Sequence, residues 1–230
     1  MDEWWTYTLA DFLLFSPRTY YRMLERHNET VWPGQILTLG LGLGIIGLLR
    51  RSTPWQGRVI TTIVAVLWAW VAWSFLWERY ATINPAAVYL AWLFAIEALL
   101  LVWIGVIRGR LLYRPGKHAA GRLGIVLFVL AVAFYPLLAP LARGPWHQGE
   151  VFGVAPDPTV FATLGLLLLI EGRPRPELLA IPLLWCSISG ATLWTMDSPE
   201  APIPALTAVL VLVASLISAR SVQRLRKRPR

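Results

Sequence analysis

The chain has 230 residues, of which 57% are hydrophobic and only 15% are charged, and its mean hydropathy is +0.56. Soluble proteins carry about 25% charged residues, so a soluble protein of this composition would expose large apolar patches. The net charge of +8 does not indicate nucleic-acid binding, because the basic residues gather at the ends of apolar runs, where they orient membrane proteins. We therefore predict an all-α, polytopic membrane helix bundle with the lipid bilayer, and no nucleic acid, as its partner.

Residues 1–29 predict an amphipathic N-terminal segment at the outer membrane interface. The start of the chain is acidic, which is not typical of a cleavable signal peptide. Ser16 followed by Pro17 has the pattern of a helix N-cap with proline at the first helical position. We expect two helices, Trp4–Phe15 and Pro17–His27, that lie in the interface or, alternatively, pack as a cap over the bundle.

Residues 30–219 contain seven apolar segments, which predict about seven transmembrane helices. The fifth segment has 13 residues, or about 20 Å of helix, which is short for a hydrocarbon core of about 30 Å. It either begins earlier, near Val151, or is a half-helix. The segments are Thr30–Leu49, Val59–Trp77, Ala86–Ile107, Leu123–Ala142, Pro158–Ile170, Leu178–Met196 and Pro202–Ala219.

The distribution of Lys and Arg predicts the orientation of the bundle. With seven spans, three loops and the tail on one side of the membrane carry three, five, two and six basic residues, which is sixteen in all. The segments on the other side of the membrane carry five. Cytoplasmic loops carry the excess of positive charge, so we place the N-terminus outside and the C-terminus in the cytoplasm. Residues 220–230 would then form a basic cytoplasmic tail.

Three stretches of the chain resemble a known family. The opening from Trp5 to Arg22 reads W-T-Y-T-L-A-D-F-L-L-F-S-P-R-T-Y-Y-R, and the others are Asp157-Pro158-Thr159-Val160-Phe161 and Ile181-Pro182-Leu183-Leu184-Trp185. They resemble a family of small bacterial multi-span membrane proteins of unknown function, whose members are sometimes labelled permease-like. The resemblance implies a location in the bacterial inner membrane, and it supplies no catalytic residue, ligand or reaction.

Glu97 is the one ionisable side chain near the centre of a long apolar segment. A carboxyl group there costs about 2.5–3.5 kcal/mol by insertion scales, so it usually has a partner or a function. By span midpoints, three polar side chains lie at the same depth, and they complete the candidate intramembrane polar site: Trp68, Tyr135 and Ser187. We expect a protonated Glu97 that either bonds one of them or belongs to a proton- or cation-coupled pathway, because an isolated carboxylate is unfavourable in a low dielectric.

A weaker candidate site lies in the outer loop, where His147, Glu150 and Asp157 have side chains that can bind a divalent metal. Their spacing matches no established motif, and a solvated polar loop is the alternative. We therefore assign no metal to the chain.

Several classes of protein are excluded by the positions of reactive residues. The two lysines and three histidines fall outside the apolar segments, so we expect no retinal and no cofactor, with axial haem ligation at a span end by His118 or His147 as the open alternative. The single cysteine, Cys186, allows no internal disulfide. No Ser-His pair, paired aspartates or HExxH motif lies within the segments, so we do not expect an enzyme.

Two patterns predict packing rather than chemistry. Gly40 and Gly44 have the spacing that lets two membrane helices approach closely. Trp70, Trp73 and Trp77 form a stripe at helical spacing, for which contact with lipid or another helix is expected and a cation or aromatic-ligand site is the sharper alternative.

The sequence favours a small permease-like protein that moves a small solute or ion along a polar pathway including Glu97. The alternative is a non-transporting accessory or scaffold subunit of a larger membrane complex, with the tryptophans as its lateral contacts. Transport predicts a water-filled cavity at Glu97, whereas a scaffold predicts a dry Glu97 and a broad apolar lateral face.

The charge distribution generates a first testable prediction. Accessibility labelling of cysteines placed at Asn28, Lys117 and Lys227 should report Asn28 outside and both lysine positions inside, because sixteen basic residues against five orient the bundle. Labelling of Asn28 and Lys117 from the same side of the membrane would exclude an odd number of crossings between these points.

Overall fold

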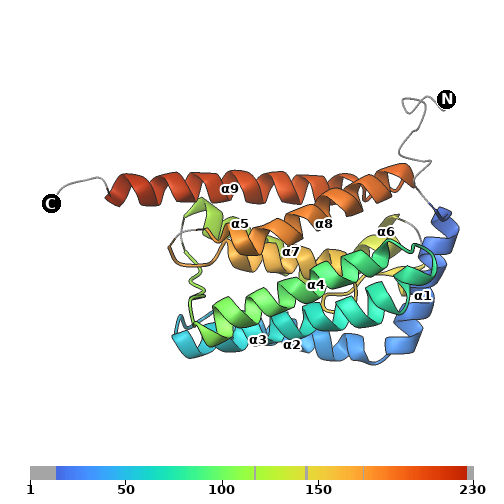
Figure 1. Cartoon of the computed structure of the whole chain (residues 1–230), viewed down its shortest axis with the longest axis horizontal. Coiled ribbons are helices and arrows are strands. Elements are labelled where there is room, and N and C mark those ends of the chain that lie inside the picture. The colour runs from blue at the N-terminus through green and yellow to red at the C-terminus, as the bar shows by residue number, and fades with distance from the viewer. Residues whose placement is uncertain (1–13, 117, 143–144, 173, 227–230) are drawn as a thin grey trace.

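The computed structural model describes residues 14–116, 118–142, 145–172 and 174–226, which form an all-α bundle (Figure 1). Lys117 and Lys227, used above as orientation markers, lie outside the described residues. The α-helices are α1 (Pro17–Val31), α2 (Gly34–Leu48), α3 (Pro54–Trp70), α4 (Ala87–Leu101), α5 (Ala119–Val129), α6 (Leu138–Ala142), α7 (Pro156–Leu167), α8 (Pro176–Thr195) and α9 (Pro202–Arg226). Turns of π-helix extend three of them: η3 (Val71–Trp77) after α3, η5 (Val102–Ile107) after α4 and η6 (Leu130–Phe134) after α5.

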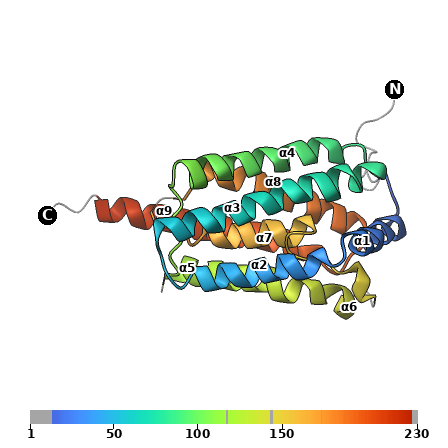
Figure 2. The same cartoon turned by 90° about the horizontal axis from the view of Figure 1, so that it is seen from below.

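The described chain runs along the bundle in alternating directions as α2, α3, α4, α5, α7, α8 and α9 (Figures 1 and 2). Helix α1 and the end of α9 therefore lie at opposite ends of the bundle. Five stretches are long and apolar enough to cross a membrane, or six if the bent pair of α1 and α2 is one broken span. Those five stretches are Pro54–Thr82, Ala87–Ile107, Ala119–Ala142, Pro176–Thr195 and Pro202–Arg220.

Helix α1 caps one end of the bundle (Figure 2). Its predicted start is confirmed: the Ser16 hydroxyl accepts a hydrogen bond from the Thr19 backbone N–H at 3.3 Å, and proline occupies the first turn. Met23, Leu24 and His27 form its buried face. The other predicted N-terminal helix, Trp4–Phe15, lies almost wholly outside the described residues.

The predicted first span, Thr30–Leu49, is wrong at its start. Thr30 and Val31 end α1, and the chain bends by 84° before α2 begins at Gly34. Trp32 adopts an extended conformation because the proline that follows disfavours helical dihedral angles. Helix α9, by contrast, continues past the predicted end at Ala219 to Arg226.

Helix α7 lies at the centre of the bundle, and all of its residues are buried. Its 12 residues span about 18 Å, so the fifth predicted segment is the half-helix that was one of its two alternatives. Helix α7 crosses α5 at Gly165 and Gly124. A Cβ added to Gly165 would lie 2.7 Å from the Gly124 carbonyl oxygen, and a Cβ added to Gly124 would lie 2.6 Å from the Gly165 carbonyl oxygen. The prediction for Gly40 and Gly44 is wrong for the described residues, because a Cβ at either glycine would meet none of their atoms within 4 Å.

The crossing of α5 and α7 makes Gly165 sensitive to substitution. Gly165→Ala should lower the free energy of unfolding by about 1–3 kcal/mol, because overpacking outweighs the roughly 1 kcal/mol that alanine contributes to a helix. Thermal unfolding of the purified protein in detergent measures the change. Gly40→Ala is the matched control and should be neutral or slightly stabilising, since its Cβ meets nothing within 4 Å. Equal stability of the two variants would contradict a close crossing.

Candidate functional site

The segment before α7 enters the bundle from its capped end. Phe152 is fully buried and packs edge to face on Phe128 with ring centroids 6.0 Å apart. Gly153 has a φ of +75°, a conformation that favours glycine, and its backbone N–H donates to the Thr159 hydroxyl at 2.8 Å. The turn at Gly153 therefore places the start of α7 inside the protein. One backbone N–H of this turn is satisfied by the side chain of Thr159, which belongs to α7.

Asp157 in the first turn of α7 is 3% exposed and accepts hydrogen bonds from two other elements. The Trp185 indole N–H donates to Oδ1 at 2.7 Å, and the Ser189 hydroxyl donates to Oδ2 at 2.8 Å. The Tyr135 hydroxyl donates to Oδ2 at 3.1 Å. A carboxylate only accepts hydrogen bonds, and its negative charge is favourable near a helix N-terminus. These four residues form what we call the Asp157 cluster.

Deeper along α7, threonine hydroxyls continue the polar row. The Thr159 hydroxyl donates to the Ala155 carbonyl at 2.7 Å, and the Thr163 hydroxyl donates to the Thr159 carbonyl at 2.8 Å. Thr163 also accepts a hydrogen bond from the Trp68 indole N–H at 2.8 Å. The face of α7 toward α3 thus carries hydroxyl groups inside an otherwise apolar core.

Glu97 on α4 is fully buried, and neither of its carboxyl oxygens has a hydrogen-bond partner among the described residues. The expected partners bond elsewhere: Trp68 to Thr163 and Tyr135 to Asp157. Ser187 is exposed on α8 and donates to the carbonyl of Leu183. The structure therefore does not bring the predicted intramembrane site together as one hydrogen-bonded group.

An aromatic contact nevertheless links Glu97 to the Asp157 cluster. Phe94, one turn before Glu97, packs against Trp68 and Trp185 with centroid distances of 4.3 and 5.1 Å. Trp185 belongs to the Asp157 cluster, and Trp68 bonds to Thr163 of α7. The rings of Trp68, Phe94 and Trp185, which we call the aromatic layer, therefore connect the helix turn that carries Glu97 with the Asp157 cluster.

The predicted outer-loop site is not assembled. His147 pairs with Glu25 of α1 at 3.1 Å, whereas Asp157 belongs to the buried cluster and Glu150 is 3% exposed. Across the described ranges, no group of three His, Cys, Asp or Glu side chains is placed to hold a metal ion. The Asn28 amide donates to the carbonyls of His147 and Gly149 at 2.8 Å, so this loop is fastened to α1.

Sequence reasoning placed Asp157 in the outer loop and missed its role as the centre of a buried cluster. Two patterns could have indicated it. Asp157 stands between two prolines at the start of an apolar run, as expected for a first helical turn, and Trp185 and Ser189 are four residues apart on one face of α8.

This fold and site define an all-α, multi-span membrane protein with polar groups buried along a central half-helix. The chain belongs to a family of unknown function, DUF6064, whose model matches residues 18–227. No curated protein and no solved structure matches the chain.

The Asp157 cluster predicts a large loss of stability on removing the charge. Asp157→Asn should lower the free energy of unfolding by about 1.5–3 kcal/mol, because the charge-assisted hydrogen bonds from Trp185, Ser189 and Tyr135 would be replaced by weaker bonds to a neutral amide. Thermal unfolding in detergent measures the effect. Asp197→Asn is the control, since Asp197 is exposed with a φ of 53°, which asparagine also adopts. Similar stability of the two variants would argue against the cluster.

Proposed function

We propose that the protein is a small permease that moves a proton or a small cationic solute along α7. The observation that carries the proposal is a fully buried half-helix whose first turn holds Asp157 inside the bundle. Membrane transporters commonly form their binding sites from discontinuous helices that end within the protein. Ionisable residues inside membrane bundles are enriched in substrate and proton pathways.

In the proposed pathway, the carboxyl groups of Asp157 and Glu97 are connected through the aromatic layer. Asp157, already surrounded by three donors, would exchange one of them for a bound cation. Glu97, whose oxygens bond to no described residue, would accept the proton or cation once it passed Phe94. Glu97 lies three residues beyond Phe94 on α4, about 4.5 Å further along the helix.

The conformation described is closed at Glu97. In the described part of the chain, Glu97 has no exposed surface, and it lines none of five surface cavities of about 380–630 Å³. The water-filled cavity that transport predicts is therefore not open at this residue. The proposal requires α4 and α8 to part at the contact of Phe94 with Trp185, which is the way alternating access opens buried sites.

An accessory subunit is the second candidate, and the exposed tryptophan face favours it. Trp73 and Trp77 stack with centroids 6.4 Å apart, and Trp77 packs edge to face on Trp92 of α4 at 6.3 Å. All three side chains are exposed. Aromatic residues are enriched in the cores of protein interfaces. Co-purification in mild detergent of a partner that is lost from Trp73→Ala/Trp92→Ala would support this candidate.

Glu97→Gln separates the two candidates. The amide keeps the shape of the side chain, so the variant should unfold within about 1 kcal/mol of wild type, in the usual range for conservative changes. If Glu97 carries a proton or cation, proton and sodium flux into proteoliposomes under an imposed membrane potential should fall at least tenfold, about 1.4 kcal/mol or more. The dye signal inside the vesicles measures the flux.

Glu171→Gln is the matched control, because Glu171 is exposed and pairs with Arg114 at 3.0 Å. It removes a carboxyl group without touching the bundle interior and should leave flux unchanged. Equal flux through wild type and Glu97→Gln, at equal stability, would remove Glu97 from the pathway and favour the accessory subunit.

A further inference from the structure

Three arginines form a ridge on the exposed face of α1. Arg18, Arg22 and Arg26 are spaced four residues apart, and all three are exposed. Like charges at this spacing destabilise a helix by a few tenths of a kcal/mol per pair. Within the described part of the chain, no salt bridge forms to any of the three, and the nearby Glu25 pairs with His147 instead. An anionic ligand would relieve this repulsion.

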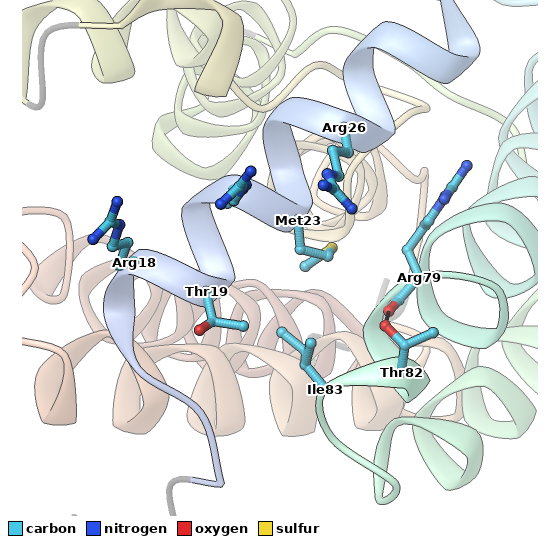
Figure 3. A pocket seen from close by; sticks show the side chains of 8 residues that line it. Arg18, Thr19, Met23, Arg26, Arg79, Thr82 and Ile83 are labelled. Atoms are coloured by element: carbon cyan, nitrogen blue, oxygen red, sulfur yellow. Dashed lines mark hydrogen bonds between the residues drawn. The ribbon is translucent and has the colours of Figure 1, made fainter.

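A cavity of about 450 Å³, which we call the arginine cavity, lies beside this ridge. Figure 3 shows Arg18 and Arg26 on α1 and Arg79 on the neighbouring segment, with Met23 between the two elements. The guanidinium of Arg79 donates to the Thr30 hydroxyl at 3.0 Å, which anchors it at the end of the ridge. The remaining lining residues are Thr19, Arg22, Thr82 and Ile83.

A second cavity of about 630 Å³, which we call the lateral groove, shares Arg79 with the first. It continues from the end of α1 along the surface between α2 and α3. Its walls along the bundle are mainly apolar, and several of them belong to the exposed lateral surface, including Leu37, Val66 and Trp73. A polar, arginine-lined cavity therefore adjoins an apolar groove that faces the surroundings of the bundle.

We propose that these two cavities bind one anionic phospholipid, with its phosphate among the arginines of α1 and Arg79 and one acyl chain in the lateral groove. Guanidinium groups bind phosphate oxygens through paired, charge-assisted hydrogen bonds. Each cavity falls in the range of about 300–1,000 Å³ that is usual for ligand sites. A soluble anion would match the arginine cavity alone and would leave the groove without an occupant. The proposal is independent of the transport function.

The whole lipid, its head and its tails can be tested separately. The probes are phosphatidylglycerol, glycerol phosphate and a diacylglycerol with the same acyl chains, each titrated onto the full chain in detergent and followed by native mass spectrometry. Wild type should retain phosphatidylglycerol at least about tenfold more strongly than either fragment, because only the whole molecule fills both cavities.

Arg22→Gln/Arg26→Gln tests the phosphate position. It should weaken phosphatidylglycerol binding about tenfold or more, the effect expected for losing charge-assisted hydrogen bonds. Arg51→Gln/Arg122→Gln is the matched control, since both arginines are exposed. Arg51 follows α2 and Arg122 lies in the first turn of α5, and these ends of the two helices are remote from α1 (Figure 1). The control loses the same charge and should bind as wild type does. If the double variant does not fold, the single variant Arg22→Gln replaces it in the test. It should also weaken phosphatidylglycerol binding, but by a smaller factor.

Gly34→Leu tests the acyl-chain position. Gly34 lines the lateral groove, and a Cβ added there meets no atom within 4 Å, so we expect leucine to be accommodated and to reach into the groove. Phosphatidylglycerol binding should fall severalfold. Gly40→Leu, also in open space and outside the groove, should leave it unchanged.

Two results would overturn the proposal. Equal retention of phosphatidylglycerol by wild type and Arg22→Gln/Arg26→Gln would place the lipid elsewhere. Binding of glycerol phosphate as strong as that of phosphatidylglycerol, with no effect of Gly34→Leu, would make the arginine cavity a site for soluble anions instead.

Discussion

The arrangement of the bundle depends on one short helix that is buried on every side. Helix α7 is too short to reach both ends of the bundle, so its first backbone donors lie inside the protein, where an unpaired polar group is costly. A turn at Gly153 supplies the entry, and the Thr159 hydroxyl accepts the turn's backbone N–H. The other end of α7 leads to Leu169, whose carbonyl accepts the Arg114 backbone N–H at 2.8 Å. The neighbouring helices are arranged around these requirements, and glycine at the α5 crossing lets the backbones approach.

Two of the buried carboxyl groups, Asp157 and Glu97, show how differently one bundle treats similar side chains. Asp157 accepts three hydrogen bonds from residues that are distant in sequence. Glu97, at comparable burial, bonds to no described residue. A fully satisfied buried polar network specifies one arrangement of its helices, whereas an unsatisfied group is a source of free energy for a conformational change or for binding. The first is suited to hold α7 and α8 against the later part of the stretch Ala119–Ala142, and the second to respond when the bundle opens.

The surface of the bundle differs between its sides and its capped end. Along the sides, exposed tryptophans, leucines and valines match a hydrocarbon environment. At the capped end, the chain bends by 84° between α1 and α2, and α1 presents arginines outward while its apolar face covers the core. An amphipathic helix at this position connects the interior, through Leu24 and His27, with a strongly basic exterior.

The sequence by itself determined the class of the protein, the start of α1 and the extent of most apolar helices, because these depend on local composition, periodicity and capping. Ser16-Pro17 and Ala86–Ile107 are recognisable within one stretch of chain. Only the tertiary structure decided which residues form the polar site. Depth along a span placed Tyr135 and Trp68 near Glu97, but depth says nothing about the direction in which a side chain points around its helix. That direction depends on packing between distant segments, which assembled the partners around Asp157 and left Glu97 without a hydrogen-bond partner among the described residues.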